Sequence, residues 1–356
     1  MADRPGPARR ICLLRLSALG DVCNCIGLVR ELQQARPRAQ ITWVIGRTEY
    51  GLVEDLPEVE FVVVDKRAGL AGFAAFRKQI RNRRFDVLLH AQVSARANAL
   101  ALLVRARRRI GFDRVRSREG HGMVVNERIA AVPFQHQAEA FLEFARALGI
   151  EPDTVNRAPP IPESAREFAR QHLPAPDRAV LISPCSSHPR RNWSARGYAA
   201  VADWVLANTD RSVVLMGGPS DLERQTGAAI ERAMKGRANN LIGQDTLKQA
   251  LAVLQRGACL IAPDSGPAHL AAALGTPVVG LYAATWSRRS GPLGSLEHCV
   301  DRFPEAARKY RRREPEQLRW GTRIEQPGVM ELIEPEAVIE KLEGVLAGPA
   351  DAASQS

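Results

Sequence analysis

Three polar loops in the second half of the chain carry the side chains best suited to binding a nucleotide. Each loop follows an apolar run that is typical of a buried strand, and together they cover residues 184–193, 217–223 and 264–266. The first loop supplies the hydroxyls of Ser186 and Ser187 and the guanidinium of Arg191, a suitable lining for a diphosphate. The second supplies the carboxylates of Asp221 and Glu223, which can accept hydrogen bonds from ribose hydroxyls. No loop has a Walker or G-x-G-x-x-G motif, so together they favour a nucleotide diphosphate over P-loop or nicotinamide chemistry.

The third loop opens a strand–turn–helix–strand unit that spans residues 258–282. Asp264, Ser265 and Gly266 form its turn, and a short apolar helix follows and ends at Gly275. Such a turn presents free backbone N–H groups, which makes it an anion-binding site. His269 falls on the first turn of this helix. The spacing alone fits a ligand-binding histidine and an ordinary helix cap with a packed histidine equally well.

In the first half of the chain one carboxylate, Asp21, stands just beyond the first apolar run. A carboxylate at the end of a strand can act as a general base on a substrate hydroxyl. The same position also suits a helix N-cap, which aspartate fills well. Position alone leaves both interpretations open.

Strand-like apolar runs alternate with helical patterns along most of the chain. This alternation predicts an α/β fold in which parallel sheets are covered by helices on both faces. We expect strands near residues 10–16, 41–45, 61–64, 86–90, 109–112, 179–184, 212–216, 258–262 and 278–282. We expect helices near residues 22–35, 51–56, 73–83, 98–104, 137–148, 164–171, 199–208, 221–234, 247–255 and 335–346. The arginine-rich stretch 303–323 shows no clear pattern.

The chain is long enough for two domains. A proline-bearing stretch, residues 151–162, interrupts the alternation and predicts a linker between them. The expected division is 1–158 and 159–334, followed by a C-terminal helix at 335–347 and a disordered tail at 348–356. Two doubly wound domains in tandem would bind ligand in a cleft at the carboxyl ends of both sheets.

The net charge of +11 is concentrated in one window. Between Lys66 and Arg118 there are fifteen Lys or Arg residues against two acids. Such a window predicts either a polyanionic partner or merely a solvated basic face. The six cysteines lack metal-binding spacing, and we expect reduced structural thiols. No apolar stretch is long enough to cross a bilayer and the N-terminus is polar, so a cytoplasmic protein is expected.

Two motifs resemble those of glycosyltransferase family 9, the heptosyltransferases. The first is Arg15-Leu16-Ser17-Ala18-Leu19-Gly20-Asp21-Val22, and the second runs from Pro263 to Ala273, with Leu281-Tyr282 after it. Between them, residues 190–194 resemble the family's basic-x-Trp-Pro segment, with Arg191 where lysine is common. The likeness covers about residues 10–347. It implies the GT-B architecture, two Rossmann-like domains that face a central cleft, and an inverting, metal-independent enzyme without a cofactor.

The resemblance also implies roles for individual residues. Asp21 would be the base that deprotonates the acceptor. Arg191, Ser186, Ser187 and the backbone amides around Ser265 and Gly266 would stabilise the diphosphate leaving group. Asp264 would contact the donor sugar, Glu223 or Asp221 the ribose, and His269 would support this loop or contact a phosphate. The implied donor is ADP-heptose.

On the acceptor side the resemblance implies a Kdo-bearing lipid A. Ser17 and Gly20 belong to the motif around the base, and Gln92 and His136 fall where the family has acceptor-side polar residues. Lys66 and Arg67 begin the basic window, which would meet Kdo carboxylates, lipid A phosphates and the anionic membrane. These features predict a peripheral enzyme on the inner face of the inner membrane.

Two other functions are compatible with parts of the sequence. The fold also suits a sugar-nucleotide enzyme with a different donor, or an epimerase. The basic window could bind nucleic acid, but it is poor in exposed aromatic motifs and no RNA- or DNA-binding signature accompanies it, so no nucleic-acid partner is expected.

Overall fold

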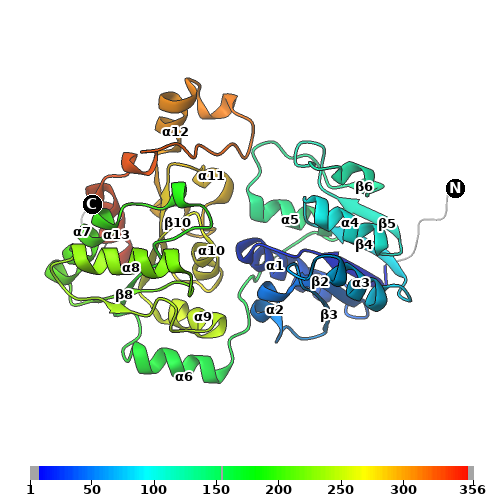
Figure 1. Cartoon of the computed structure of the whole chain (residues 1–356), viewed down its shortest axis with the longest axis horizontal. Helices are drawn as coiled ribbons and strands as arrows, with labels where there is room; N and C mark the ends of the chain where they lie inside the picture. Colours follow the sequence, from blue (N-terminus) through cyan, green and yellow to red (C-terminus); the bar gives the residue numbers. More distant parts are fainter. Residues whose placement is uncertain (1–7, 154, 352–356) are drawn as a thin grey trace. The chain divides into compact units, whose positions relative to one another are not determined.

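The computed structural model describes residues 8–153 and 155–351, and these divide into two compact units. Unit 1 is Met1–Pro160 and unit 2 is Ile161–Ser356. Each contains one six-stranded sheet whose paired strands all run parallel. The α/β class and the doubly wound parallel sheets predicted from the sequence are therefore confirmed (Figure 1).

Unit 1 places its first strand in the middle of its sheet, in the order β3-β2-β1-β4-β5-β6. Leu14 at the end of β1 lies opposite His90 at the end of β4, so the carboxyl ends of these strands are level. The strands are β1 Arg10–Leu14, β2 Gln40–Gly46, β3 Val59–Val64, β4 Phe85–His90, β5 Ala106–Gly111 and β6 Glu127–Arg128. The helices are α1 Leu19–Ala35, α2 Arg47–Val53, α3 Gly69–Ile80, α4 Ala95–Leu103 and α5 Gln137–Arg146, with a 3-10 turn at His121–Met123.

Unit 2 repeats this plan in the order β12-β11-β10-β7-β8-β9. Its strands are β7 Ala179–Ile182, β8 Ser212–Leu215, β9 Asn239–Asn240, β10 Cys259–Pro263, β11 Val278–Tyr282 and β12 Val300–Asp301. Its helices are α6 Glu163–His172, α7 Ala195–Asn208, α8 Asp221–Ala233, α9 Leu247–Arg256, α10 Gly266–Ala273, α11 Ser287–Ser290, α12 Phe303–Ala306 and α13 Pro335–Asp351. Short 3-10 turns occur at Pro189–Arg191, Leu296–His298, Pro315–Gln317 and Met330–Leu332.

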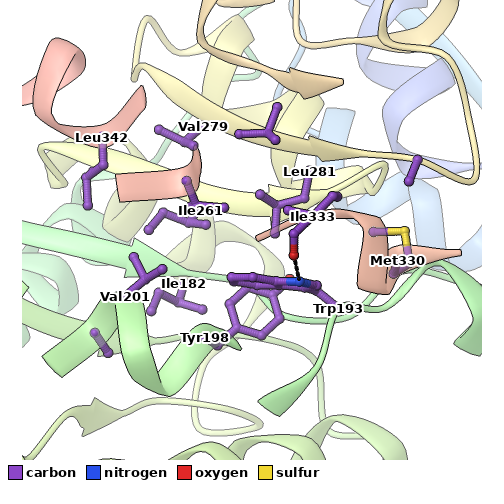
Figure 2. Close-up of a cluster of buried hydrophobic side chains, with 14 of the residues drawn as sticks. Ile182, Trp193, Tyr198, Val201, Ile261, Val279, Leu281, Met330, Ile333 and Leu342 are labelled. Carbon is purple, nitrogen blue, oxygen red and sulfur yellow. Dashed lines mark hydrogen bonds between the residues drawn. The ribbon is translucent and has the colours of Figure 1, made fainter. Parts of the chain in front are cut away.

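Trp193 anchors the buried core of unit 2. It packs against Tyr198 with the ring centroids 5.1 Å apart, and its indole N–H donates to the carbonyl of Ile333 at 3.0 Å (Figure 2). Residues 184–193 are therefore held against the segment that precedes α13. This contact fixes the polar loop in which Ser186 and Arg191 lie.

The structure corrects several predicted boundaries. Helix α1 begins at Leu19, three residues before the prediction. Strand β5 begins inside the arginine run, because it pairs with β6 only at Ile110 and Gly111 and its earlier residues have no strand on that side to demand apolar side chains. The unassigned stretch 303–323 contains α12, a π-helical turn at Ala307–Arg311 and a 3-10 turn. Helix α13 runs to Asp351, beyond its predicted end at 347, and residues 352–356 of the expected tail lie outside the described residues.

Candidate functional site

Asp21 stands in the first turn of α1 at the carboxyl end of β1. The N-cap of this helix is Ala18, so Asp21 does not cap it. Its carboxylate instead forms an ion pair with Arg15, whose side chain is buried. The N-cap interpretation is therefore wrong. The carboxylate of Asp21 is about 30% exposed, at the end of the sheet where the strands finish.

Arg15 is the residue that fixes this carboxylate. Its Nη1 donates to the carbonyl of Ala91 at 2.7 Å, and its guanidinium lies 5.3 Å from the ring centre of Phe141 on α5. With one nitrogen on the backbone and another on Asp21, the guanidinium has a single orientation. The sequence signal for this role was a charged residue in an otherwise apolar run.

Gln92 braces the loop between β1 and α1. Its Oε1 accepts from the N–H of Leu16 at 2.6 Å and of Ser17 at 3.3 Å, and its Nε2 donates to the Ser17 hydroxyl. The structure thus brings together Ser17, the buried Gly20, Asp21 and Gln92. The side chain of Gln92 therefore supports this loop through its hydrogen bonds. Any contact with the acceptor substrate, as the sequence predicts, would be made in addition to these bonds.

The other predicted acceptor residues have different surroundings. The Lys66 ammonium lies 2.8 Å and 2.9 Å from the two oxygens of the buried Glu49, whereas Arg67 is exposed. His136 caps α5, because its Nδ1 accepts from the N–H of Ala138 at 3.2 Å. Lys66 and His136 therefore already have structural roles.

Two buried histidines lie at the same edge of the sheet and were missed by the sequence analysis. The rings of His90 and His121 are 4.5 Å apart, and Nε2 of His121 accepts from the N–H of Phe112 at 3.0 Å. Burial lowers the pKa of His90 to about 3 and that of His121 to about 4. Both rings are therefore neutral near pH 7.

In unit 2, Arg191 is buried and held by a carboxylate far along the chain. Its Nε and Nη2 donate to Oε1 of Glu325 at 2.9 Å and 2.6 Å. Partial burial would raise the pKa of Glu325, but the hydrogen bonds and charge of Arg191 outweigh it and lower that pKa. Nη1 of Arg191 makes no hydrogen bond with the described part of the chain and can still donate to a ligand. Glu325 was not identified from the sequence.

The hydroxyls beside Arg191 differ in their availability. Ser186 is buried, and its Oγ donates to the carbonyl of His188 at 3.1 Å. Its backbone N–H donates to Asn192, which closes the loop. Ser187 is exposed. The loop is thus preorganised around Arg191, with Ser187 the more accessible of the two hydroxyls.

The turn at Asp264–Gly266 has the features of an anion site. Ser265 is the N-cap of α10 but makes no side-chain cap bond, and its Oγ is buried without a partner among the described residues. An unpartnered buried hydroxyl costs folding free energy unless a ligand satisfies it. The first backbone N–H groups of α10, starting at Gly266, have no acceptor inside the helix.

Asp264 and His269 form a pair beside this turn. The carboxylate Oδ1 lies 3.8 Å from Nε2 of His269, and Oδ2 accepts from the hydroxyl of Ser290 at 3.3 Å. Burial favours the neutral acid, but the contact with His269, a hydrogen bond from Thr285 and the charge of Arg191 together outweigh it and lower the pKa of Asp264. His269 therefore helps to keep Asp264 ionised.

The glycine loop before α8 is held by Glu223. Its two carboxylate oxygens accept from the N–H of Gly218 at 2.8 Å and from the hydroxyl of Ser220 at 2.6 Å. Asp221 is exposed at the start of α8. Nearby, burial and then the charge of Glu223 raise the pKa of Asp245 to about 6, and its Oδ2 is buried without a partner in the described chain. Asp245 is a further polar group that the sequence analysis missed.

Comparison with known proteins bears on what these groups do. Residues 73–319 match the family model described as glycosyltransferase family 9 (heptosyltransferase). The chain is 34% identical over 334 residues to the lipopolysaccharide core heptosyltransferase OpsX of Haemophilus influenzae, covering 94% of this chain and 96% of that one.

Solved structures with low sequence identity share the fold. A family 9 glycosyltransferase from Veillonella parvula superposes with a TM-score of 0.77 at 23% identity, covering 95% of this chain and 97% of that one. The E. coli heptosyltransferase WaaC, solved with ADP, gives 0.72 at 18% identity, covering 94% and 99%. The two Rossmann-like domains expected from the sequence are confirmed, with the fold of solved family 9 structures. This chain belongs to glycosyltransferase family 9, the heptosyltransferases.

Proposed function

We propose that this enzyme transfers heptose from ADP-heptose to a Kdo-bearing lipid A in the assembly of the lipopolysaccharide inner core. The observation that carries the proposal is the Arg15–Asp21 pair, which holds one partly exposed carboxylate at the end of β1. The relative with 34% identity is a lipopolysaccharide core heptosyltransferase, and a structural neighbour was solved with ADP. These two names support the acceptor class and the nucleotide.

The proposed reaction is a single in-line displacement. Asp21 accepts the proton of the acceptor hydroxyl, and the resulting oxygen nucleophile attacks the anomeric carbon of the heptose. The bond from that carbon to the diphosphate oxygen breaks, and ADP leaves with the electron pair. Attack opposite the leaving group inverts the anomeric configuration. Each step can be completed by groups of this chain together with its two substrates.

The negative charge that develops on the diphosphate is the second requirement. We assign its stabilisation to Nη1 of Arg191, the Ser265 hydroxyl and the first N–H groups of α10. We also assign Ser187 to the diphosphate and Asp264 to the hydroxyls of the sugar. Each carboxylate oxygen of Glu223 already accepts one hydrogen bond that supports the glycine loop, and its remaining lone pairs can accept ribose hydroxyls.

None of the described helices is both long and apolar enough to cross a membrane. Because the proposed acceptor is lipid-linked, we propose that the enzyme works as a peripheral protein at the inner face of the inner membrane.

The decisive experiment combines the purified protein, ADP-heptose and Kdo-lipid A, with the product weighed by mass spectrometry. The expected product is larger by one heptose, and Asp21→Ala and Asp21→Asn should each lower the rate by about 10² to 10⁴. Use of UDP- or GDP-sugars in place of ADP-heptose would refute the donor assignment. Unchanged transfer by folded Asp21→Asn would refute the base.

A further inference from the structure

Exposed apolar side chains in unit 1 gather at one edge of its sheet. Among the described residues of this unit, six large apolar side chains are exposed, and five of them follow the carboxyl ends of strands: Leu70 after β3, Val115 and Met123 after β5, and Val132 and Phe134 after β6. Isolated exposed apolar residues are normal on a protein surface. Their concentration at a single sheet edge calls for a partner.

The two most exposed of these side chains stand on opposite sides of the candidate base. Leu70 is 89% exposed and Met123 is 87% exposed. Strands β1 and β4, which precede Asp21 and Gln92, lie between β3 and β5 in the sheet. Neighbouring parallel strands are about 4.8 Å apart, so β3 and β5, which are four strand positions apart, are separated by roughly 20 Å. The candidate base thus lies between two apolar tips.

Met123 is held at the surface by a rigid support. Two residues earlier, His121 is fully buried and accepts the N–H of Phe112. The carbonyl of Glu119 accepts from Asn98 Nδ2 at 2.6 Å, and Gly120 takes the left-handed φ of 76° that the turn requires. Because the turn is already anchored, insertion of Met123 into a partner costs side-chain entropy but no further ordering of the backbone.

Cationic side chains accompany both tips. Arg67 precedes Leu70 by three residues, and Arg114 and Arg118 lie in the segment that leads from β5 to Met123; all three are exposed and make no ion pair with the described chain. Other members of the basic window are engaged internally, such as Lys66 with Glu49 and Arg116 with Asp113. Apolar tips flanked by available arginines match the boundary between the headgroups and acyl chains of an anionic bilayer.

We propose that residues 65–70 and 112–123 form the surface by which this protein docks on an anionic lipid bilayer, with Leu70 and Met123 as its apolar anchors. Docking by this surface would turn the candidate base Asp21 toward the membrane. That orientation helps catalysis only if the acceptor is lipid-linked, so this part of the inference rests on the proposed function. Lipid binding itself does not depend on that reaction. Each inserted side chain removes apolar surface from water, and each arginine is attracted to the anionic headgroups.

The chain provides a matched control in the same unit. Leu102 is 66% exposed but lies in the last turn of α4, which runs back from β4 to the start of β5 and so ends at the opposite edge of the sheet. All six native cysteines are buried. The single substitutions Leu70→Cys, Met123→Cys and Leu102→Cys can therefore carry an environment-sensitive fluorophore without labelling the rest of the folded protein.

The test uses the full chain and vesicles of phosphatidylglycerol with phosphatidylethanolamine, and phosphatidylcholine vesicles for comparison. Labels at 70 and 123 should shift to the blue on anionic vesicles, and the label at 102 should not. In sedimentation, Leu70→Ser with Met123→Ser should weaken partitioning about tenfold or more, whereas Leu102→Ser should not change it. Arg114→Gln with Arg118→Gln should weaken it at low salt by about fivefold for each arginine.

Several results would overturn the proposal. These are no binding to anionic vesicles, an equal response of the label at 102, wild-type partitioning of the double serine variant, or burial of these tips in a dimer without lipid binding. The double serine variant should retain its kcat on a deacylated, water-soluble acceptor and lose activity on a vesicle-embedded one. Absence of transfer by the wild type with either acceptor would refute the proposed function and leave the vesicle result intact.

Discussion

Replacing Arg15 with glutamine tests whether the orientation of Asp21 limits the rate. The substitution removes a charge-assisted bond to Asp21 and a 2.7 Å bond to the Ala91 carbonyl. A hydrogen bond to a charged group is worth about 1.5–3 kcal/mol. If the whole of this energy positions the base, kcat falls by about 10- to 150-fold. The donor KM should stay within about twofold, because the residues assigned to the donor belong to unit 2.

A loss of folding would lower activity without any role in positioning, so a control variant is needed. Arg109→Gln removes a half-buried guanidinium that caps the carbonyls of Ala101, Val104 and Val124 at 2.6–2.8 Å and touches none of the candidate site residues. Both variants are measured by urea unfolding and by initial rates at saturating substrates. Arg15→Gln should lose kcat at full folded fraction, and Arg109→Gln should lose only stability. A kcat for Arg15→Gln within about threefold of wild type, or an equal loss in the control, would refute the reasoning.

Three further predictions concern other groups. Ser265→Ala should leave the free energy of unfolding unchanged or raise it by up to about 1–3 kcal/mol, because it removes a buried hydroxyl that has no partner in the described chain. It should also raise the donor KM several-fold, and an unchanged KM would remove Ser265 from the site. Glu325→Gln should lower the free energy of unfolding at pH 7 by about 1–2 kcal/mol. The pKa of Glu325 is lowered in the folded state, so its contribution is complete above its unfolded pKa of about 4.5 and is lost as the pH falls toward the folded pKa. The difference from wild type should therefore shrink at acidic pH, and a constant difference would contradict this. The pKa values of His90 and His121 are lowered in the folded state, so below about pH 6.5 the unfolded chain binds more protons than the folded one. The free energy of unfolding should therefore fall by up to about 1.4 kcal/mol per pH unit for each histidine as the pH drops from 6 to about 4.5. Urea unfolding of the wild type and of His121→Asn across this range measures the slope.

Much of the fold follows from apolar periodicity, because buried parallel strands and the helices that cover them have strong patterns. Each predicted strand overlaps a strand of the structure. The two-residue strands β6, β9 and β12 were missed, because pairs this short at the outer positions of a sheet rest on backbone hydrogen bonds and leave no side-chain pattern. The stretch 303–323 could not be assigned, since its short turns are stabilised by local contacts such as Arg308 with Glu314.

The candidate site was only partly predictable for a related reason. The positions of Asp21 and Ser265 are set by local turns, which sequence can indicate. The partner of Arg191 is Glu325, 134 residues away, and no local pattern connects the two. Arg15 lies only six residues before Asp21, and its guanidinium pairs with that carboxylate. Its orientation, however, depends on Ala91 and Phe141, which come from other parts of the chain. Pairings of this kind require the tertiary structure.

The basic window shows how far a count of charges can go. Its excess of arginine predicts attraction to an anionic surface, but that attraction is screened beyond about 8 Å at physiological salt and does not select an orientation. Internal partners occupy some of the cations, as Glu49 does for Lys66. The orientation must therefore come from short-range contacts, and Leu70 and Met123 are placed to provide them. Charge would thus govern how fast the protein reaches the membrane, and two apolar side chains would govern which edge of unit 1 faces it.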